Sequence, residues 1–235
     1  QNVLDLSGKW DFEIDRNNLG EKENWIQKKL GDYISLPGSM PEKLKGDDVT
    51  AHTKWTGSLY DSTYYYSPYM EKYRKEGNIK LSFFLTPDKH YVGVAWYKKE
   101  IKIPSSWKGE RIELFLERPH IETTVWINGK KVGTKNSLCV PHIYDLTDFV
   151  HPGNCQIAIR VDNRIKDINV GSDSHSITDQ TQGNWNGVVG KICLRTTSKI
   201  YFDDIQVFPD IHKKCAKIKM KILSANKTHR KITVT

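Results

Sequence analysis

Side chains suited to holding a sugar gather between residues 162 and 187. A sugar ring offers a face of C–H groups that stacks on an aromatic ring, while its hydroxyls pair with amides and carboxylates. The stretch "TDQTQGNWNG" sets one Trp among such groups, and "DNRIKDINVGSDSHSI" before it adds more of them. We therefore predict a carbohydrate-binding loop whose candidate residues are Asn163, His175, Asp179, Gln182, Asn184, Trp185 and Asn186.

The same run has a structural interpretation as well. Trp185 would then fill the edge of a sheet, and the Asn and Asp side chains would satisfy backbone groups in turns. A structural calcium ion is a weaker third interpretation, because the run is rich in Asp but has no EF-hand spacing. From the residues alone, binding and a structural role both stay open.

A catalytic apparatus leaves no trace in the sequence. The chain contains no G-x-S-x-G elbow, no H-E-x-x-H, no Gly-rich phosphate loop and no dinucleotide fingerprint. Nothing marks two carboxylates as the pair that glycoside hydrolysis requires. No His lies at ligand spacing from another His or Cys, so we predict no catalytic residue and no metal ligand. Cys155, Cys193 and Cys215 lie in apolar strand patterns and are predicted to be buried free thiols, and Cys139 is the fourth cysteine.

Alternation of apolar and polar residues dominates the elements that must position these groups. It predicts strands at 8–14, 111–117, 155–163, 188–194, 199–209 and 216–222. Asn128-Gly129, inside "IETTVWINGKKVG", predicts a tight hairpin, because both residues tolerate positive φ. One short helix is expected over 21–30. Many short strands with almost no helix predict an all-β sandwich.

The charge pattern argues against nucleic acid as a partner. The formal net charge is +8, but the densest lysines alternate with apolar residues near the C-terminus, as on a strand with one solvated face. No apolar run approaches the ~20 residues that span a bilayer, so no membrane span is predicted. Between residues 37 and 87 the alternation loosens into a long aromatic stretch, which indicates a functional loop or a segment packed on a neighbour.

An ordered set of motifs resembles a known family. "LSGKWDFEID", "LPGSM", "GVAWYKKEIKIP", "ERPHIETTVWINGKKVG" and "GNWNGVVGKICL" together resemble the N-terminal sugar-binding domain of family 2 glycoside hydrolases. That family includes β-galactosidases, β-glucuronidases and β-mannosidases. "IYFDDIQVFPD" resembles the start of the immunoglobulin-like domain that follows. The resemblance implies a jelly-roll (galactose-binding-like) β-sandwich over residues 1–198, and the first strands of a truncated immunoglobulin-like sandwich over 199–235.

The resemblance also implies that catalysis and sugar contact lie in different domains of the parent protein. The family's catalytic glutamates lie in a (β/α)₈ barrel, so this chain alone is expected to be inactive, as the front part of an exo-acting retaining β-glycosidase of β-galactosidase-like type. The barrel of the parent chain and a terminal β-linked sugar are its expected partners. The family's sugar-contacting Asp is expected near Thr181, where this sequence has no Asp, and Asp179 lies two residues earlier. Periplasmic or secreted localisation is expected, with a signal already removed. The alternatives are a self-sufficient carbohydrate-binding module and a purely structural accessory domain.

Overall fold

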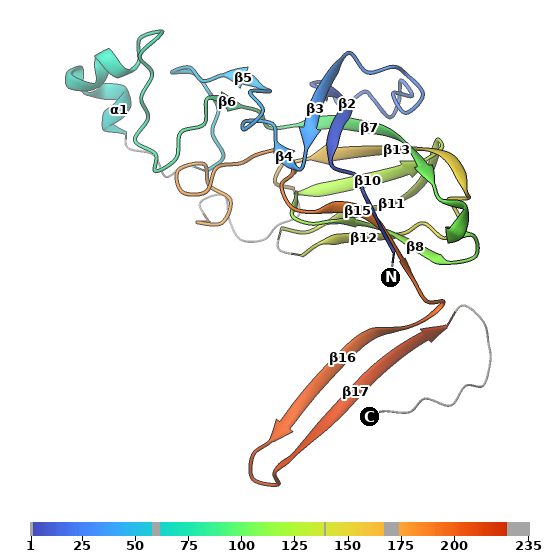
Figure 1. Cartoon of the computed structure of the whole chain (residues 1–235). Helices are drawn as coiled ribbons and strands as arrows, with labels where there is room; N and C mark the ends of the chain where they lie inside the picture. Colours follow the sequence, from blue (N-terminus) through green and yellow to red (C-terminus); the bar gives the residue numbers. More distant parts are fainter. Residues whose placement is uncertain (1, 58–61, 139, 167–173, 225–235) are drawn as a thin grey trace.

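Two antiparallel sheets form the body of the molecule (Figure 1). The structure is a computed structural model that describes residues 2–57, 62–138, 140–166 and 174–224. The larger sheet has the strand order β11 (Lys130–Asn136), β10 (Glu122–Ile127), β13 (Gly153–Asp162), β7 (Val94–Ile103), β2 (Gly8–Asp15) and β3 (Asp32–Leu36). The smaller has the order β1 (Val3–Asp5), β15 (Ile192–Thr197), β8 (Arg111–Leu116) and β12 (His142–Asp145). The predicted all-β sandwich is confirmed.

Alternation along the strands builds the core between the two sheets. On β2 the side chains of Trp10 and Phe12 are buried, while Asp11 between them is partly exposed. Their cluster also holds Tyr97 of β7 and Leu114 of β8, so both sheets contribute to one apolar layer. Removing this apolar surface from water is the main driving force for closing the sandwich.

The turn between β10 and β11 matches its prediction. Asn128 and Gly129 have φ values of 47° and 82°, as a two-residue hairpin turn of the primed type requires. The strands on either side pair antiparallel from Glu122 opposite Asn136 to Ile127 opposite Lys130. This hairpin lies at one edge of the larger sheet.

The helix predicted over 21–30 was wrong, because this segment folds as successive turns over the outer face of the larger sheet. Asn24 has a φ of 53°, which interrupts a right-handed helix. The segment instead buries its apolar side chains against that face, in a second cluster made of Trp25, Ile26, Leu30, Val94, Trp96, Trp126 and Ala158.

Three short strands close one end of the sandwich. The order is β4 (Gly38–Ser39), β14 (Gly187–Val188) and β9 (Pro119–His120), with β14 in the middle. A side chain at Gly187 would meet the Gly38 carbonyl oxygen at 2.4 Å, and the φ of Gly187 is +140°, so only glycine fits there. The sheet therefore brings three segments that are far apart in the sequence to one place.

The loose aromatic stretch forms a projection beside this end. It begins with β5 (Asp47–Asp48), which pairs with β6 (Lys89–His90), and carries helix α1 (Thr63–Tyr66) and a 3₁₀ turn at Pro68–Tyr73 between them. A second 3₁₀ turn lies at Ser105–Trp107. Tyr64 is buried, whereas Tyr66 is 84% exposed. No helix in the described part of the chain is long and apolar enough to cross a bilayer.

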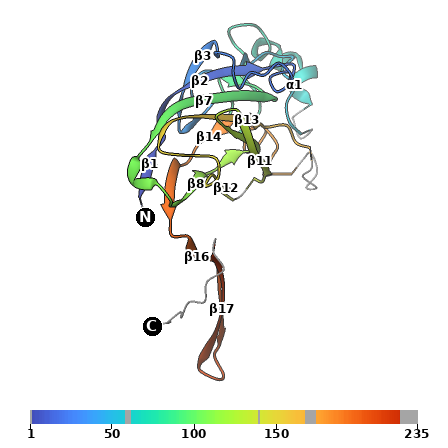
Figure 2. The ribbon, with the colours of Figure 1, turned by 90° about the vertical axis from the view of Figure 1, so that its right-hand side faces the viewer.

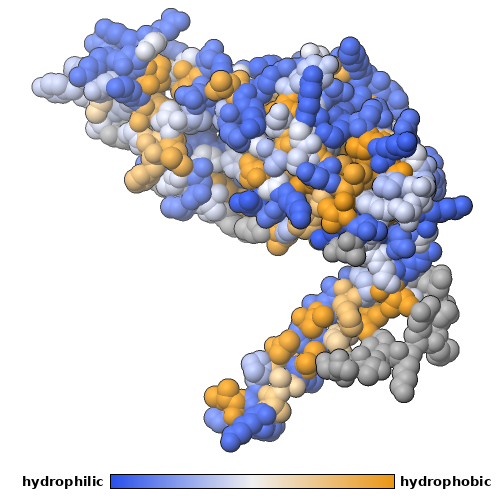
Figure 3. Space-filling view, in the orientation of Figure 1, coloured by the Kyte–Doolittle hydropathy of each residue, from blue (hydrophilic) through white to orange (hydrophobic). Residues whose placement is uncertain are grey.

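A two-stranded ribbon, β16 (Ile200–Asp210) and β17 (Cys215–Ser224), leaves the sandwich after β15 (Figures 1 and 2). Among the described residues these two strands pair only with each other. Apolar side chains stay exposed along the ribbon (Figure 3), among them Ile205, Val207 and Ile218. Cys155 and Cys193 are buried free thiols as predicted, but Cys215 is exposed, because no second sheet within the described ranges covers the ribbon. Cys139 lies outside the described residues.

Candidate functional site

The seven predicted sugar-site residues divide into two groups. Four of them have buried side chains, and three reach the surface. The buried group is Asn163, Asp179, Asn184 and Asn186. Gln182 and His175 are exposed, and Trp185 is half-buried. The structure therefore brings most of the set together around one loop but gives its members different tasks.

Asp179 ties this loop to the aromatic projection. One carboxylate oxygen, Oδ1, accepts a hydrogen bond of 2.6 Å from the backbone N–H of Asn184. The other, Oδ2, accepts one of 2.6 Å from the backbone N–H of Thr56 and lies 3.3 Å from Nε2 of His90. Since the carboxylate is only 2% exposed, these bonds form away from water, where losing one is costly. Asp179 thus fixes the loop in place.

Asn163 and Asn184 form an amide pair behind Asp179. The Nδ2 group of Asn163 donates to Oδ1 of Asn184 at 3.0 Å and to the Tyr91 carbonyl at 2.8 Å. Its Oδ1 accepts from the Gly93 N–H at 2.8 Å. The Nδ2 group of Asn184 donates to Oγ1 of Thr56 and to the Asn163 carbonyl. Protein groups use the hydrogen-bonding capacity of both amides.

Asn186 holds the turn into β14 from inside the sandwich. Its Nδ2 group donates to the carbonyls of Gly93 and Val161, both at 3.1 Å. Its Oδ1 accepts a hydrogen bond of 2.7 Å from the hydroxyl of Tyr97, whose pKa burial raises well above the usual value. The four buried side chains therefore position the loop backbone, and the groups at the surface are left to meet a ligand.

Trp185 stacks on a buried imidazole. The rings of Trp185 and His120 lie 4.7 Å apart at an interplanar angle of 23°. His120 is nine-tenths buried, and its Nε2 has no hydrogen-bond partner among the described residues. Burial lowers the pKa of His120 to about 4, against smaller opposing effects of Asn184 and Asp179. At neutral pH an uncharged ring therefore supports the indole.

A pocket of about 230 Å³ opens beside Trp185. Gln182, Gly183 and Asn184 line it from the loop, Ser39 and Pro41 from the β4 region, and Leu85, Thr86 and Pro87 from the aromatic projection. Its volume lies below the roughly 300–1,000 Å³ of sites for drug-sized ligands, so it suits one small ring. An aromatic face, an exposed amide and hydroxyls are the groups that a sugar requires. The exposed His175 is not among the lining residues.

Sequence reasoning missed His120 and the three residues of the projection. His120 lies at no ligand spacing, and its partner Trp185 is far away in the sequence, so no local pattern indicates it. For Leu85, Thr86 and Pro87 one signal was present, namely the long stretch without alternation, which is typical of functional loops. The lack of alternation does not identify any individual residue within the stretch.

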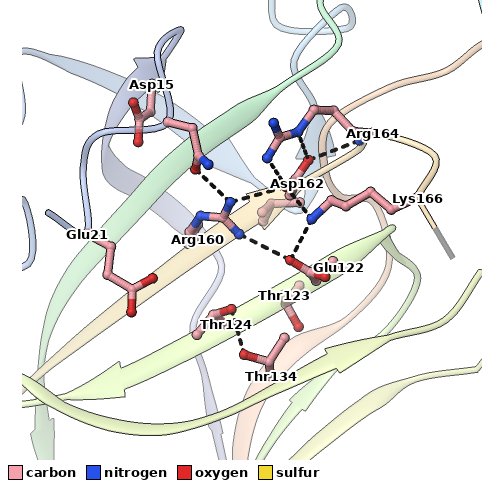
Figure 4. A network of polar contacts seen from close by, with 12 residues as sticks. Asp15, Glu21, Glu122, Thr123, Thr124, Thr134, Arg160, Asp162, Arg164 and Lys166 are labelled. Carbon is pink, nitrogen blue, oxygen red and sulfur yellow. Dashed lines mark hydrogen bonds and ion pairs between the residues drawn. The ribbon is translucent and has the colours of Figure 1, made fainter.

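A charged network fixes the point where the loop leaves β13 (Figure 4). Asp162 is fully buried and accepts hydrogen bonds from Arg164 and Arg160, and it pairs with Lys166 at 2.7 Å. Burial alone would raise the pKa of Asp162, but the hydrogen bonds from Arg164 and Lys166 hold it well below its usual range. Arg160 also reaches Glu122 on β10. The network therefore anchors the strand end to the neighbouring strand.

Within the described ranges, no group of three or more His, Cys, Asp or Glu side chains is arranged to hold a metal ion. Part of the Asp-rich run, residues 167–173, lies outside those ranges. The structural calcium ion therefore stays a prediction.

Comparison with known proteins places this sandwich in a family. The model of the sugar-binding domain of glycosyl hydrolases family 2 matches residues 3–198. A curated β-glucuronidase of Paenibacillus borealis is 24% identical over 226 residues, which cover 89% of this chain and 31% of that protein. A β-galactosidase of Priestia megaterium is 25% identical over 206 residues, covering 86% of this chain and 17% of that protein.

Solved structures agree on the fold. A β-glucuronidase from an uncultured Clostridium species superposes with a TM-score of 0.62 at 20% identity, over 94% of this chain and 34% of that one. The Ruminococcus gnavus β-glucuronidase also gives 0.62, at 16% identity, over 97% of this chain and 35% of that one. The chain thus spans about a third or less of these relatives. With a family model matched over most of its length, the chain belongs to glycosyl hydrolases family 2 and carries that family's sugar-binding domain.

Proposed function

We propose that this chain is the non-catalytic N-terminal part of an exo-acting retaining β-glycosidase, and that its Trp185 loop shapes the substrate site. The observation that carries the proposal is the half-buried indole of Trp185, stacked on His120 beside a pocket for one ring. In this arrangement the C–H face of a terminal β-linked sugar packs on the indole, and the Gln182 amide bonds a hydroxyl.

The buried network supports this proposal through rigidity. Asp179, Asn163 and Asn184 hold the loop before any ligand arrives. Binding then orders few side chains, which lowers its entropic cost. A loose loop with the same surface groups would bind more weakly.

The proposal extends to the whole protein. A catalytic barrel in the same polypeptide carries the reacting carboxylates, and the exposed projection around Tyr66 packs on it. The terminal sugar is of the galactose or glucuronate type, since relatives of both names match. Residues 199–235 begin an immunoglobulin-like domain, whose other sheet covers the apolar face of the β16–β17 ribbon. The enzyme acts in the periplasm or outside the cell.

Calorimetric titration of the chain with methyl β-D-galactopyranoside and with glucuronate tests the sugar contact. We expect millimolar binding that weakens about tenfold in Trp185→Ala, because the stacking face is lost. Tyr66→Ala removes an exposed aromatic ring elsewhere and serves as the matched control. Equal affinities for the wild type and Trp185→Ala would contradict the proposal. The chain alone should release no nitrophenol from aryl β-glycosides.

A structural accessory role is the second candidate, favoured by one observation. The four buried candidate residues use their hydrogen bonds on the protein itself, as an edge-sealing loop would. In that case Trp185 packs on the barrel, and sugar titrations with the isolated chain show no heat in any variant.

A further inference from the structure

A second and larger pocket lies on the other side of the Asp179 network. Its volume is about 670 Å³, and its lining includes Arg16, Asp47, Trp55 and Tyr91. The short β5–β6 ladder contributes Asp47, Asp48 and His90 to the lining, and Asp47 pairs opposite His90. None of the seven sugar-site candidates lines this pocket, so it is separate from the Trp185 pocket.

Trp55 gives this pocket an aromatic wall. The indole is half-buried and held by two rings, Phe83 at 5.0 Å in an edge contact and His90 at 4.6 Å. Its N–H makes no hydrogen bond within the described part of the chain. A ring that is fixed by its neighbours and lines a cavity is suited to stacking on a ligand.

Charged side chains add acceptors and donors to the lining of the pocket. The Arg16 guanidinium donates two hydrogen bonds to Asp47, at 3.0 and 2.6 Å, and lies 5.7 Å from the ring of Tyr91. The bond from Arg16 holds the pKa of Asp47 below its usual value. Lys89 pairs with Asp48 at 2.5 Å. Both carboxylates are more than half exposed, so oxygen lone pairs stay available to a ligand.

The loop that carries Trp55 is ordered by its own hydroxyls. The Thr50 N–H donates to Oγ1 of Thr53 at 2.9 Å, and the His52 N–H donates to Oγ1 of Thr50 at 3.1 Å. Each hydroxyl accepts in these bonds and keeps its own hydrogen for a further partner. The pocket therefore combines hydroxyl donors, carboxylate acceptors and an aromatic face.

We propose that this pocket is a second carbohydrate-binding site, in which a pyranose ring stacks on Trp55 and its hydroxyls bond Asp47, Asp48 and Arg16. Balanced charge pairs with an aromatic wall favour a polar, hydroxyl-rich ring over an anion or an apolar ligand. The site holds a sugar other than the one at Trp185, such as a further residue of the same glycan or a separate chain.

Asp179 joins the two sites. Its Oδ2 accepts the N–H of Thr56, which follows Trp55, and its Oδ1 accepts the N–H of Asn184, which precedes Trp185. One carboxylate therefore fixes the backbone beside each indole. Asp179 is a positioning residue for both sites and touches neither sugar.

The indole N–H signals of the ¹⁵N-labelled chain test the proposal. Trp55→Phe and Trp185→Phe assign the two signals, and the probes are the methyl β-D-pyranosides of galactose, glucose and mannose, together with glucuronate. We expect a saturable shift of the Trp55 signal with at least one probe, retained in Trp185→Phe. Asp47→Asn should weaken that titration about tenfold, since it removes a charged acceptor and one of the two bonds that position Arg16.

Two results overturn the proposal. One is a Trp55 signal that none of the four probes moves. The other is a shift that disappears in Trp185→Phe, which would mean a single site. A probe that shifts the Trp55 signal but not the Trp185 signal would count against the function proposed for the Trp185 pocket. It would still support a sugar site at Trp55. Tyr69→Ala, an exposed ring of the projection, is the control that should change neither titration.

Discussion

At the residue scale, Asp179 decides whether the two loops stay in place. In Asp179→Asn one oxygen becomes an NH₂ group that faces a backbone N–H, so one buried donor loses its acceptor. We expect a loss of about 1–3 kcal/mol in the free energy of unfolding, measured by urea denaturation. Asp148→Asn changes an exposed carboxylate and should leave stability unchanged. Equal midpoints for both variants would refute this role of Asp179.

The residue types of the site could be predicted from the sequence, but the direction of each side chain could not. The run of amides with one Trp predicted a binding loop, and residues of this loop line the Trp185 pocket. Whether Asn184 faces a ligand or the protein depends on Thr56, which is 128 residues away. A single sequence does not show which distant segment arrives to satisfy a polar group.

At the element scale, the β16–β17 ribbon is the exposed part of the fold. Cross-strand pairing puts Val207 opposite Ile218 and Ile205 opposite Met220, all on one face. An uncovered apolar face on a two-stranded ribbon favours pairing with a second copy. We expect concentration-dependent self-association of the chain in sedimentation, which Val207→Glu with Ile218→Lys suppresses. Gln206→Glu lies on the opposite face and should leave it unchanged. A chain that stays monomeric at every concentration would argue against this.

Elements with strong local signals were predictable, and those set by packing were not. Asn128-Gly129 determines its own turn through φ, so the hairpin followed from two residues. The 21–30 segment has helix-forming residues, but Trp25 and Ile26 gain more from covering Trp96 than a helix would allow. Asp15 completes the arrangement, since it accepts hydrogen bonds from the backbone N–H of Gly20 and from the indole of Trp96.

At the scale of the whole molecule, buried histidines make stability depend on pH. His142 is 1% exposed, and burial lowers its pKa to about 4 from the usual 6.5. Between these values the unfolded chain binds a proton that the folded chain does not. Stability is therefore full above pH 6.5 and falls as the pH drops toward 4, by about 1–3 kcal/mol for this residue.

Urea unfolding of the wild type and His142→Gln at pH 7, 5.5 and 4.5 checks this expectation. The variant starts less stable, because Thr123 loses its bond to Nδ1 of His142, but its stability should fall less with acid. His151→Gln changes an exposed histidine and should keep the wild-type slope. Parallel curves for all three proteins would mean that His142 does not carry the effect.

The Asp179 carboxylate also limits how the domain can be engineered or can diverge. A loop that is locked to a second loop is not an independent module. Transplanting residues 174–186 into another sandwich would carry over Trp185 but leave Oδ2 of Asp179 without the Thr56 N–H. The loops that carry Thr56 and Asp179 should therefore be exchanged as a pair. A substitution in one of them restricts the substitutions that the other accepts.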